Sequence, residues 1–303
     1  MRLASLCYNA LRVAGVTKLA RRLASGGVVL CYHNVVARTD GSTANRLGLH
    51  MPLANFERQM RWLASHYAVV PLEELVSRVE RGASLRGVAA VTFDDGYVGV
   101  FEHAWPLLRD LRIPATVFVV ADAHERDEGF WWDDPDVLRA LSPERHQHWL
   151  TALKGDRRAI VRSVVPSRPP WQPPPWCRPA NWRAIAAAAG SGLHIGVHSA
   201  THRSLPALHD ADLHHEVVES RDVIRRNTGV TPVLFAYPYG LWDDRVRGAV
   251  QSAGYRGAFI LAADRAAKRD PWALPRVNVP AGIEDAAFQA WTTGLGLRRG
   301  HHA

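Results

Sequence analysis

Short apolar runs that alternate with helical segments are the feature of this 303-residue chain that most restricts its fold. Runs rich in β-branched and aromatic residues predict strands, and the longer amphipathic stretches between them predict helices. The predicted strands are residues 28–32, 69–71, 88–93, 115–120, 194–197, 233–237 and 257–260, and the predicted helices include 54–65, 72–81, 182–189 and 213–228. This alternation predicts an α/β fold with parallel strands inside and helices outside.

The chain length and a hydrophobic content of 47% are sufficient for one α/β domain with a buried core, so no second domain is required. We expect a basic amphipathic helix over residues 1–26, the main domain over 27–290 and a tail over 291–303. Residues 122–181 do not fit the alternation. Because the proline-dense run in 166–179 cannot join a central ladder, we interpret 122–181 as an inserted loop region rich in Trp and Pro.

Two groups of metal-ligand side chains follow predicted strands. Asp94 and Asp95 come directly after residues 88–93, and His198 and His202 come after residues 194–197. The carboxyl ends of parallel strands share one face of an α/β sheet or barrel, so these side chains are expected to meet. Asp95, His198 and His202 would supply one oxygen and two imidazole nitrogens, a set that suits Zn²⁺ or a similar divalent ion.

Each motif also has an ordinary interpretation. An Asp-Asp-Gly segment by itself is usually a turn, and His-x-x-x-His is usually a pair of histidines on one helix face. Their occurrence together, each after a predicted strand, favours a metal site in which Asp94 is left free to accept a proton from water.

With these motifs the chain resembles the metal-dependent polysaccharide deacetylases of carbohydrate esterase family four, over about residues 27–282. In that family a Thr-Phe-Asp-Asp-Gly segment, here residues 92–96, carries the catalytic base and then a metal ligand. A His-Ser/Thr-x-x-His segment carries two more ligands, and residues 198–202 match it with one residue more. The resemblance implies an irregular (β/α) barrel of about seven parallel strands and is strongest to the bacterial poly-N-acetylglucosamine and exopolysaccharide branch.

A third family segment corresponds to residues 235–240, Phe-Ala-Tyr-Pro-Tyr-Gly. The resemblance implies that the backbone N–H of Tyr239 points at the developing oxyanion and that Tyr237 and Pro238 line the substrate groove. Many members have an arginine at the position of Ala236, and that arginine steadies the catalytic aspartate. We expect Arg276 to supply the missing cation here.

His33 is the expected general acid. Most members place a histidine near the carboxyl end of the domain to protonate the leaving amine, and the Leu-Pro-Arg-Val stretch of this chain has none. Residues 28–35 resemble instead the Tyr-His segment that opens the circularly permuted members. An imidazole titrates close to neutral pH, which suits this role. The alternative is a histidine that only bonds a backbone carbonyl.

Trp131 and Trp132 in the insertion are expected substrate-binding residues, because flat indole faces can stack on sugar rings. The alternative is that these tryptophans pin a long loop to the barrel.

Charge is concentrated at the amino terminus, where six basic residues precede the first acidic one, Asp40, in a chain of formal net charge +8. Residues 1–25 predict a basic amphipathic helix that can lie on an anionic membrane, or else a packing helix. They contain no continuous apolar stretch, so neither a signal peptide nor a membrane span is predicted. Basic residues elsewhere do not cluster as in nucleic-acid binding proteins, and no nucleic-acid partner is expected. Three scattered cysteines indicate free thiols and a reducing compartment. We therefore expect a cytoplasmic location, with peripheral association at the inner membrane face.

These interpretations predict a hydrolase that acts on a non-peptide carbon–nitrogen bond. It would remove N-acetyl groups from an amino-sugar polysaccharide, oligosaccharide or glycan precursor, with Zn²⁺ as cofactor and Co²⁺ or Ni²⁺ as alternatives. An O-acetyl esterase, a lipid-linked sugar deacylase and a non-catalytic carbohydrate-binding protein remain open.

Overall fold

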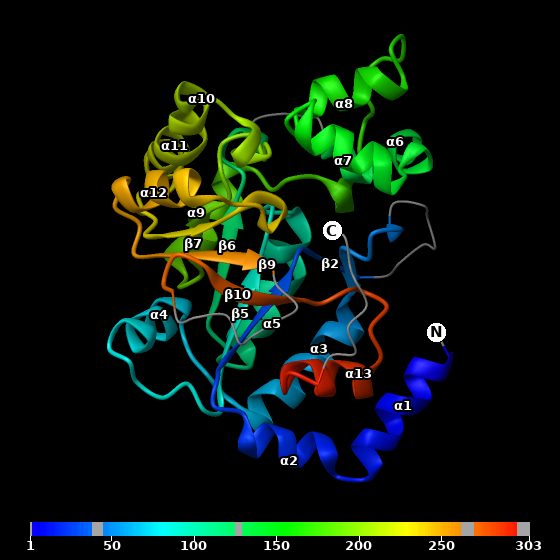
Figure 1. The fold of residues 1–303 in the computed structure, drawn as a ribbon, viewed down its shortest axis with the longest axis vertical. Helices are drawn as coiled ribbons and strands as arrows, with labels where there is room; N and C mark the ends of the chain where they lie inside the picture. Colours follow the sequence, from blue (N-terminus) through cyan, green and yellow to red (C-terminus); the bar gives the residue numbers. More distant parts are fainter. Residues whose placement is uncertain (1, 38–44, 125–128, 262–269, 296–303) are drawn as a thin grey trace.

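A computed structural model describes residues 2–37, 45–124, 129–261 and 270–295 of the chain (Figure 1). Seven parallel strands close into a barrel in the order β1-β10-β9-β8-β7-β6-β5, with β5 paired back to β1. The strands are β1 (Val28–Tyr32), β5 (Val88–Phe93), β6 (Ala115–Val119), β7 (His194–Val197), β8 (Leu234–Ala236), β9 (Gly257–Leu261) and β10 (Leu274–Asn278). The predicted α/β barrel of about seven parallel strands is therefore confirmed.

One of the seven strands of the barrel differs from the strands predicted from the sequence. The predicted strand at residues 69–71 is β4 (Ala68–Val69), which pairs with β5 outside the ring. The seventh place belongs to β10, which contains Pro275 opposite Ile260 of β9. No strand was predicted there, and Pro275 lacks the N–H that a strand interior normally donates, which weakens the local signal for a strand. A separate parallel pair joins β2 (Asn34–Val36) to β3 (His50–Pro52).

Alternate residues of the strands fill the interior of the barrel. Val29, Phe118 and Phe259 belong to one buried cluster with the apolar face of α4 (Leu72–Glu80), which closes one end. Gly196 is required beside this cluster, because an added Cβ would lie 2.4 Å from the Phe118 ring. The strands therefore read as continuous apolar runs, buried on both faces.

The remaining helices form the outer layer, and a larger buried cluster lies between them and the strands. These helices are α3 (Leu53–His66), α5 (Trp105–Asp110), α9 (Trp182–Gly190), α10 (Asp210–His214), α11 (Ser220–Thr228), α12 (Asp244–Ser252) and α13 (Asp285–Thr292).

The insertion is more helical than the sequence indicated. Its elements are η4 (Trp131–Asp133), α6 (Pro135–Ala140), α7 (Pro143–Thr151), α8 (Arg157–Val164) and η5 (Pro175–Cys177). Figure 1 shows α6, α7 and α8 together at one end of the molecule. The insertion has an apolar cluster of its own, which includes Trp149 and Ile160.

The amino-terminal segment forms two helices where one was predicted. These are α1 (Arg2–Val13) and α2 (Val16–Leu23), and the chain turns between them at Gly15, whose φ of 74° is left-handed. Tyr8 of α1 is buried against α13, and its hydroxyl accepts a hydrogen bond from Trp291 Nε1 at 2.9 Å. The predicted tail begins inside α13, and residues 296–303 lie outside the described residues.

Candidate active site

Asp94 lies at the carboxyl end of β5 and is held by a forked ion pair. Arg276 of β10 donates from Nη1 to Asp94 Oδ1 at 2.6 Å and from Nη2 to Oδ2 at 2.7 Å. Both side chains are fully buried, and the guanidinium lies 5.2 Å from the Phe118 ring centroid inside the barrel. Bidentate charge-assisted bonds of this kind fix the orientation of a carboxylate. The expected contact between Arg276 and Asp94 is thus present.

The surroundings of Asp94 keep it ionised. Burial by itself would raise its pKa, but Arg276 and His198 have the opposite effect, and the net pKa lies below its usual value. Cys31 Sγ donates to Asp94 Oδ2 at 3.3 Å. Burial raises the pKa of the Cys31 thiol well above its usual value, so Cys31 is a neutral donor and not a nucleophile.

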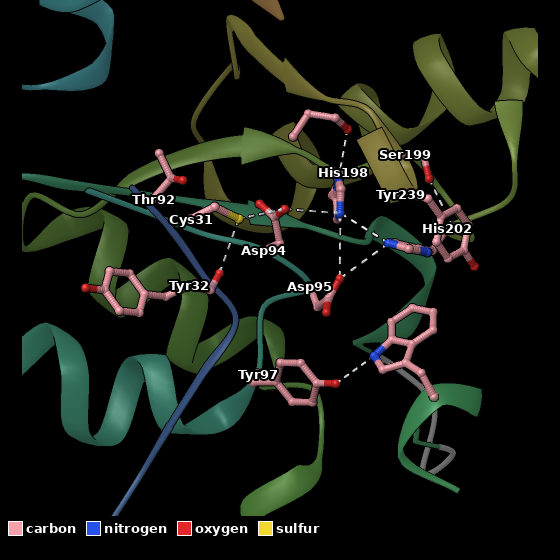
Figure 2. Close-up of polar contacts among 12 residues, drawn as sticks. Cys31, Tyr32, Thr92, Asp94, Asp95, Tyr97, His198, Ser199, His202 and Tyr239 are labelled. Carbon is pink, nitrogen blue, oxygen red and sulfur yellow. Dashed lines mark hydrogen bonds and ion pairs between the residues drawn. The ribbon is translucent and has the colours of Figure 1, made fainter. Parts of the chain in front are cut away.

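Asp95, His198 and His202 converge beside Asp94 (Figure 2). Each offers a ligand atom, and these atoms all lie within 4.8 Å of one another. Asp95 Oδ1 is 3.7 Å from His198 Nε2 and 3.5 Å from His202 Nε2, and the two Nε2 atoms are 3.2 Å apart. The structure thus brings together the three residues predicted to bind a metal.

The chemistry of this group fits a divalent cation. His198 Nδ1 donates to the Ala236 carbonyl at 2.8 Å, which leaves Nε2 with its lone pair directed toward Asp95. Asp95 Oδ1 is buried and has no hydrogen-bond partner among the described residues. Burial, and then the charge of Asp94, raise the pKa of Asp95, and burial lowers the pKa of both histidines. Neutral imidazoles and a buried carboxylate oxygen that lacks a hydrogen-bond partner are suitable donors for such a cation.

The loop from β7 that carries the histidines is held in an unusual conformation. Ser199 and His202 have left-handed φ angles of 65° and 60°. Glu216, buried in η7 (His215–Glu219), accepts hydrogen bonds from the backbone N–H groups of Ala200 at 2.9 Å and Thr201 at 2.8 Å. No sequence motif marked Glu216, because it lies in an ordinary amphipathic stretch. Glu216 acts through the loop, because it fixes the positions of the His198 and His202 imidazoles.

His33 follows β1 and lies close to Asp94. One of its ring nitrogens is within 4.8 Å of a carboxylate oxygen of Asp94 and of Cys31 Sγ. Burial lowers the pKa of His33 to about 4, against the opposing effect of Asp94. This lowered pKa lies below the titration near neutral pH that was expected, and it favours a neutral imidazole at pH 7.

Tyr239 lies over the metal-ligand group. Its ring centroid is 4.5 Å from that of His202, and its φ of 58° turns the backbone sharply after Pro238. Tyr237, by contrast, is fully buried, and its hydroxyl donates to the Trp272 carbonyl at 3.0 Å. Pro238 is buried as well. Neither side chain is exposed in this structure, and the assignment of Tyr237 and Pro238 to the substrate groove stays a prediction.

Trp131 and Trp132 are also buried, with exposed fractions of 3% and 6%. Trp132 packs its ring at 4.4 Å from the His202 ring and donates from Nε1 to the Tyr97 hydroxyl at 2.8 Å. Trp131 donates to the Tyr239 hydroxyl at 3.2 Å. Neither tryptophan offers a free face to a sugar, so the alternative interpretation, that they pin the insertion to the barrel, fits the structure better.

Asp133 provides the central polar contacts between the insertion and the barrel. It is fully buried, and it accepts from the Tyr97 hydroxyl at 2.6 Å and lies 3.0 Å from His50 Nε2. Asn34 Nδ2 in turn lies 3.1 Å from His50 Nδ1. Sequence reasoning missed this network, whose members come from four distant segments and form no local motif.

The fold and the site together define an α/β-barrel protein with a paired-aspartate centre and a candidate divalent-metal site at the carboxyl ends of its strands. The chain belongs to the polysaccharide deacetylase family, whose model matches residues 81–258.

Individual relatives agree with this assignment. A poly-beta-1,6-N-acetyl-D-glucosamine N-deacetylase of Staphylococcus aureus is 33% identical over 247 residues, which cover 78% of this chain and 68% of the relative. Among solved structures, IcaB from Ammonifex degensii has a TM-score of 0.62 at 20% identity, over 89% of this chain and 97% of the other. Deacetylase PplD of Streptococcus pyogenes, solved with acetate, has a TM-score of 0.62 at 16% identity, over 86% and 94% of the two chains. At these identities the structural matches show the shared fold alone.

Proposed function

We propose that the protein is a metal-dependent deacetylase that removes N-acetyl groups from an amino-sugar glycan of the poly-N-acetylglucosamine type. The observation that carries this proposal is the Arg276–Asp94 fork beside the group formed by Asp95, His198 and His202. A carbohydrate-binding groove has no need of a buried, oriented carboxylate next to metal ligands. The named activity of the 33% identical relative supports the choice of substrate.

Asp95, His198 and His202 would hold the divalent cation, with Zn²⁺ preferred for this ligand set. When bound, such a cation lowers the pKa of water and polarises the amide carbonyl of the substrate.

Asp94 is the proposed base. Its low pKa keeps the carboxylate ionised, and the Arg276 fork fixes the direction from which it accepts a proton. The water oxygen then bonds to the acyl carbon, and the backbone N–H of Tyr239 is proposed to bond the negative oxygen that develops there.

His33 is proposed to protonate the departing amine. Because the imidazole is neutral at pH 7, the proton that it delivers must first reach it. We propose that Asp94, whose carboxylate lies within 4.8 Å, passes on the proton taken from water through one bridging water molecule. Rupture of the carbon–nitrogen bond then yields a free amino sugar and acetate.

The test is acetate release by Zn²⁺-loaded protein from β-1,6-linked and β-1,4-linked N-acetylglucosamine oligomers and from acetylated xylan. Asp94→Asn is the test variant, and Asp210→Asn, the same change at a side chain 90% exposed, is the control. We expect release from the amino-sugar oligomers that is lost in Asp94→Asn and kept in Asp210→Asn. Release from xylan alone would indicate an O-acetyl esterase, and no release from protein that holds its metal would contradict an enzyme for these substrates.

A further inference from the structure

The α1–α2 hairpin is attached to the rest of the molecule by one face only. Tyr8 of α1 is buried against α13, and Thr17 of α2 is buried as well. In Figure 1 the two helices lie along the edge of the molecule farthest from α6, α7 and α8.

The outer face of the hairpin is apolar and exposed. Five of the eight large apolar side chains exposed in the described part of the chain lie here, with exposed fractions between 37% and 82%: Leu6, Val13, Val16, Leu19 and Leu23. A soluble domain rarely gathers such side chains on one short segment without a binding partner.

A cavity of about 270 Å³ lies on the attached side of the hairpin, between it and helices α3 and α13. Its lining includes three cations, Arg12, Lys18 and Arg21, together with the hydroxyl of Thr17 and the amide of Gln289. Among the described residues that line the cavity, none is acidic. The Arg21 guanidinium lies 6.0 Å from the Trp62 ring centroid, which supports one wall. The cavity therefore offers several donors and uncompensated positive charge to a small anion.

The positive charge of the hairpin favours an anionic partner. Neither α1 nor α2 contains an acidic residue. A second copy of the chain would bring like charges together, whereas an anionic bilayer offers both a complementary charge and an apolar layer. None of the helices within residues 2–37, 45–124, 129–261 and 270–295 has the length and apolarity to cross a membrane.

We propose that the α1–α2 hairpin docks on an anionic lipid bilayer, with its exposed leucines and valines in the interface and its basic side chains attracting the anionic headgroups. The burial of apolar side chains and the attraction between opposite charges are each modest, and they act together, as stable attachment to a membrane surface requires. This inference is independent of the proposed reaction.

Flotation of the full-length protein with lipid vesicles tests the proposal. The vesicles are phosphatidylcholine alone, or phosphatidylcholine with about one third phosphatidylglycerol. The Lys18→Gln/Arg21→Gln variant removes two charges of the cavity, and Leu19→Ser/Leu23→Ser removes two apolar contacts. Arg225→Gln/Arg226→Gln on the exposed side of α11 is the control for total charge.

We expect the wild type to float with the phosphatidylglycerol vesicles and not with neutral ones. Each hairpin variant should weaken vesicle binding about tenfold or more, and the α11 control should bind as the wild type does. Equal binding to both kinds of vesicle, or an equal loss in the control, would overturn the proposal. Saturable binding of inorganic phosphate without flotation would show a soluble-anion site and would also overturn it. Thermal unfolding of each variant checks that it is folded.

Discussion

Asp94 and Arg276 form a buried ion pair. The function of this pair depends on its geometry. The carboxylate must be ionised to accept a proton, and the two parallel bonds from the guanidinium keep it both ionised and aimed. Loss of either partner would leave a buried charge uncompensated.

Arg276→Lys keeps the positive charge of the pair but loses the fork. We expect kcat/KM for acetate release to fall about 10²-fold because the base is misplaced. The pKa of Asp94 should also rise, so that activity is lost at a higher pH as the solution is acidified. A pH profile of kcat/KM checks both effects, with Arg245→Lys at a partly exposed ion pair as control. An unchanged acidic limb would argue against this role of Arg276.

His124 provides a prediction about stability. Burial lowers its pKa to about 4, although its bond to the Ala180 carbonyl opposes the shift. Between pH 6.5 and 4 the unfolded chain therefore binds a proton that the folded chain does not, and stability falls as the pH falls. From pH 7 to pH 5 this group costs about 2 kcal/mol. Urea unfolding at both pH values should show a smaller loss, by about that amount, for His124→Gln than for the wild type; equal losses would contradict it.

At the residue scale, the sequence was informative where the chemistry is local. Asp94 and Asp95 are adjacent, and His198 and His202 are four apart, so one short window shows each group. Cys31 and Glu216 contact the site through strand register and helix placement, and no window of the sequence shows those contacts.

The insertion contacts the site directly. Trp132 packs on the candidate metal ligand His202, and Asp133 of the same turn accepts a hydrogen bond from Tyr97. Placement of this turn therefore restricts where the His202 ring can lie.

Asp133→Asn should weaken the attachment of the insertion to the barrel. An amide has one acceptor oxygen, so it cannot bond both Tyr97 and His50 as the two carboxylate oxygens do. We expect a loss of about 1–3 kcal/mol in the free energy of unfolding, measured in urea. Asp110→Asn, at an exposed helix end, should change it by less than about 0.5 kcal/mol. A similar small effect in both variants would mean that Asp133 does not hold the insertion.

Element prediction failed where a single residue contradicted its context. No strand was predicted at residues 274–278, where Pro275 interrupts the pattern, yet β10 forms and delivers Arg276 to the site. The apolar pattern at 69–71 was read correctly as a strand, but pattern alone could not place it outside the ring.

At the scale of the whole molecule, closure of the ring between β1 and β5 gathers side chains from widely separated segments. Periodicity predicted alternating strands and helices; the barrel, as distinct from an open sheet, came from the family resemblance. Apolar side chains fill the interior next to Arg276, and we expect a substrate to approach the end where Asp94 lies.

Metal binding should stabilise the whole molecule, because the cation binds residues that only the folded chain brings together. Chelation with EDTA should lower the thermal midpoint of the wild type, and Zn²⁺ should restore it. His202→Ala should show no such response. A midpoint that does not depend on metal in the wild type would contradict the assignment of Asp95, His198 and His202 as ligands.

The central claim is that Asp94 works beside one divalent cation held by Asp95, His198 and His202. The most direct measurement is a Zn²⁺ titration of metal-free protein, followed by acetate release from a β-1,6-linked N-acetylglucosamine oligomer. We predict that activity rises linearly and levels off at one ion per chain. Full activity before any Zn²⁺ is added, or no activity at any ratio, would contradict the claim.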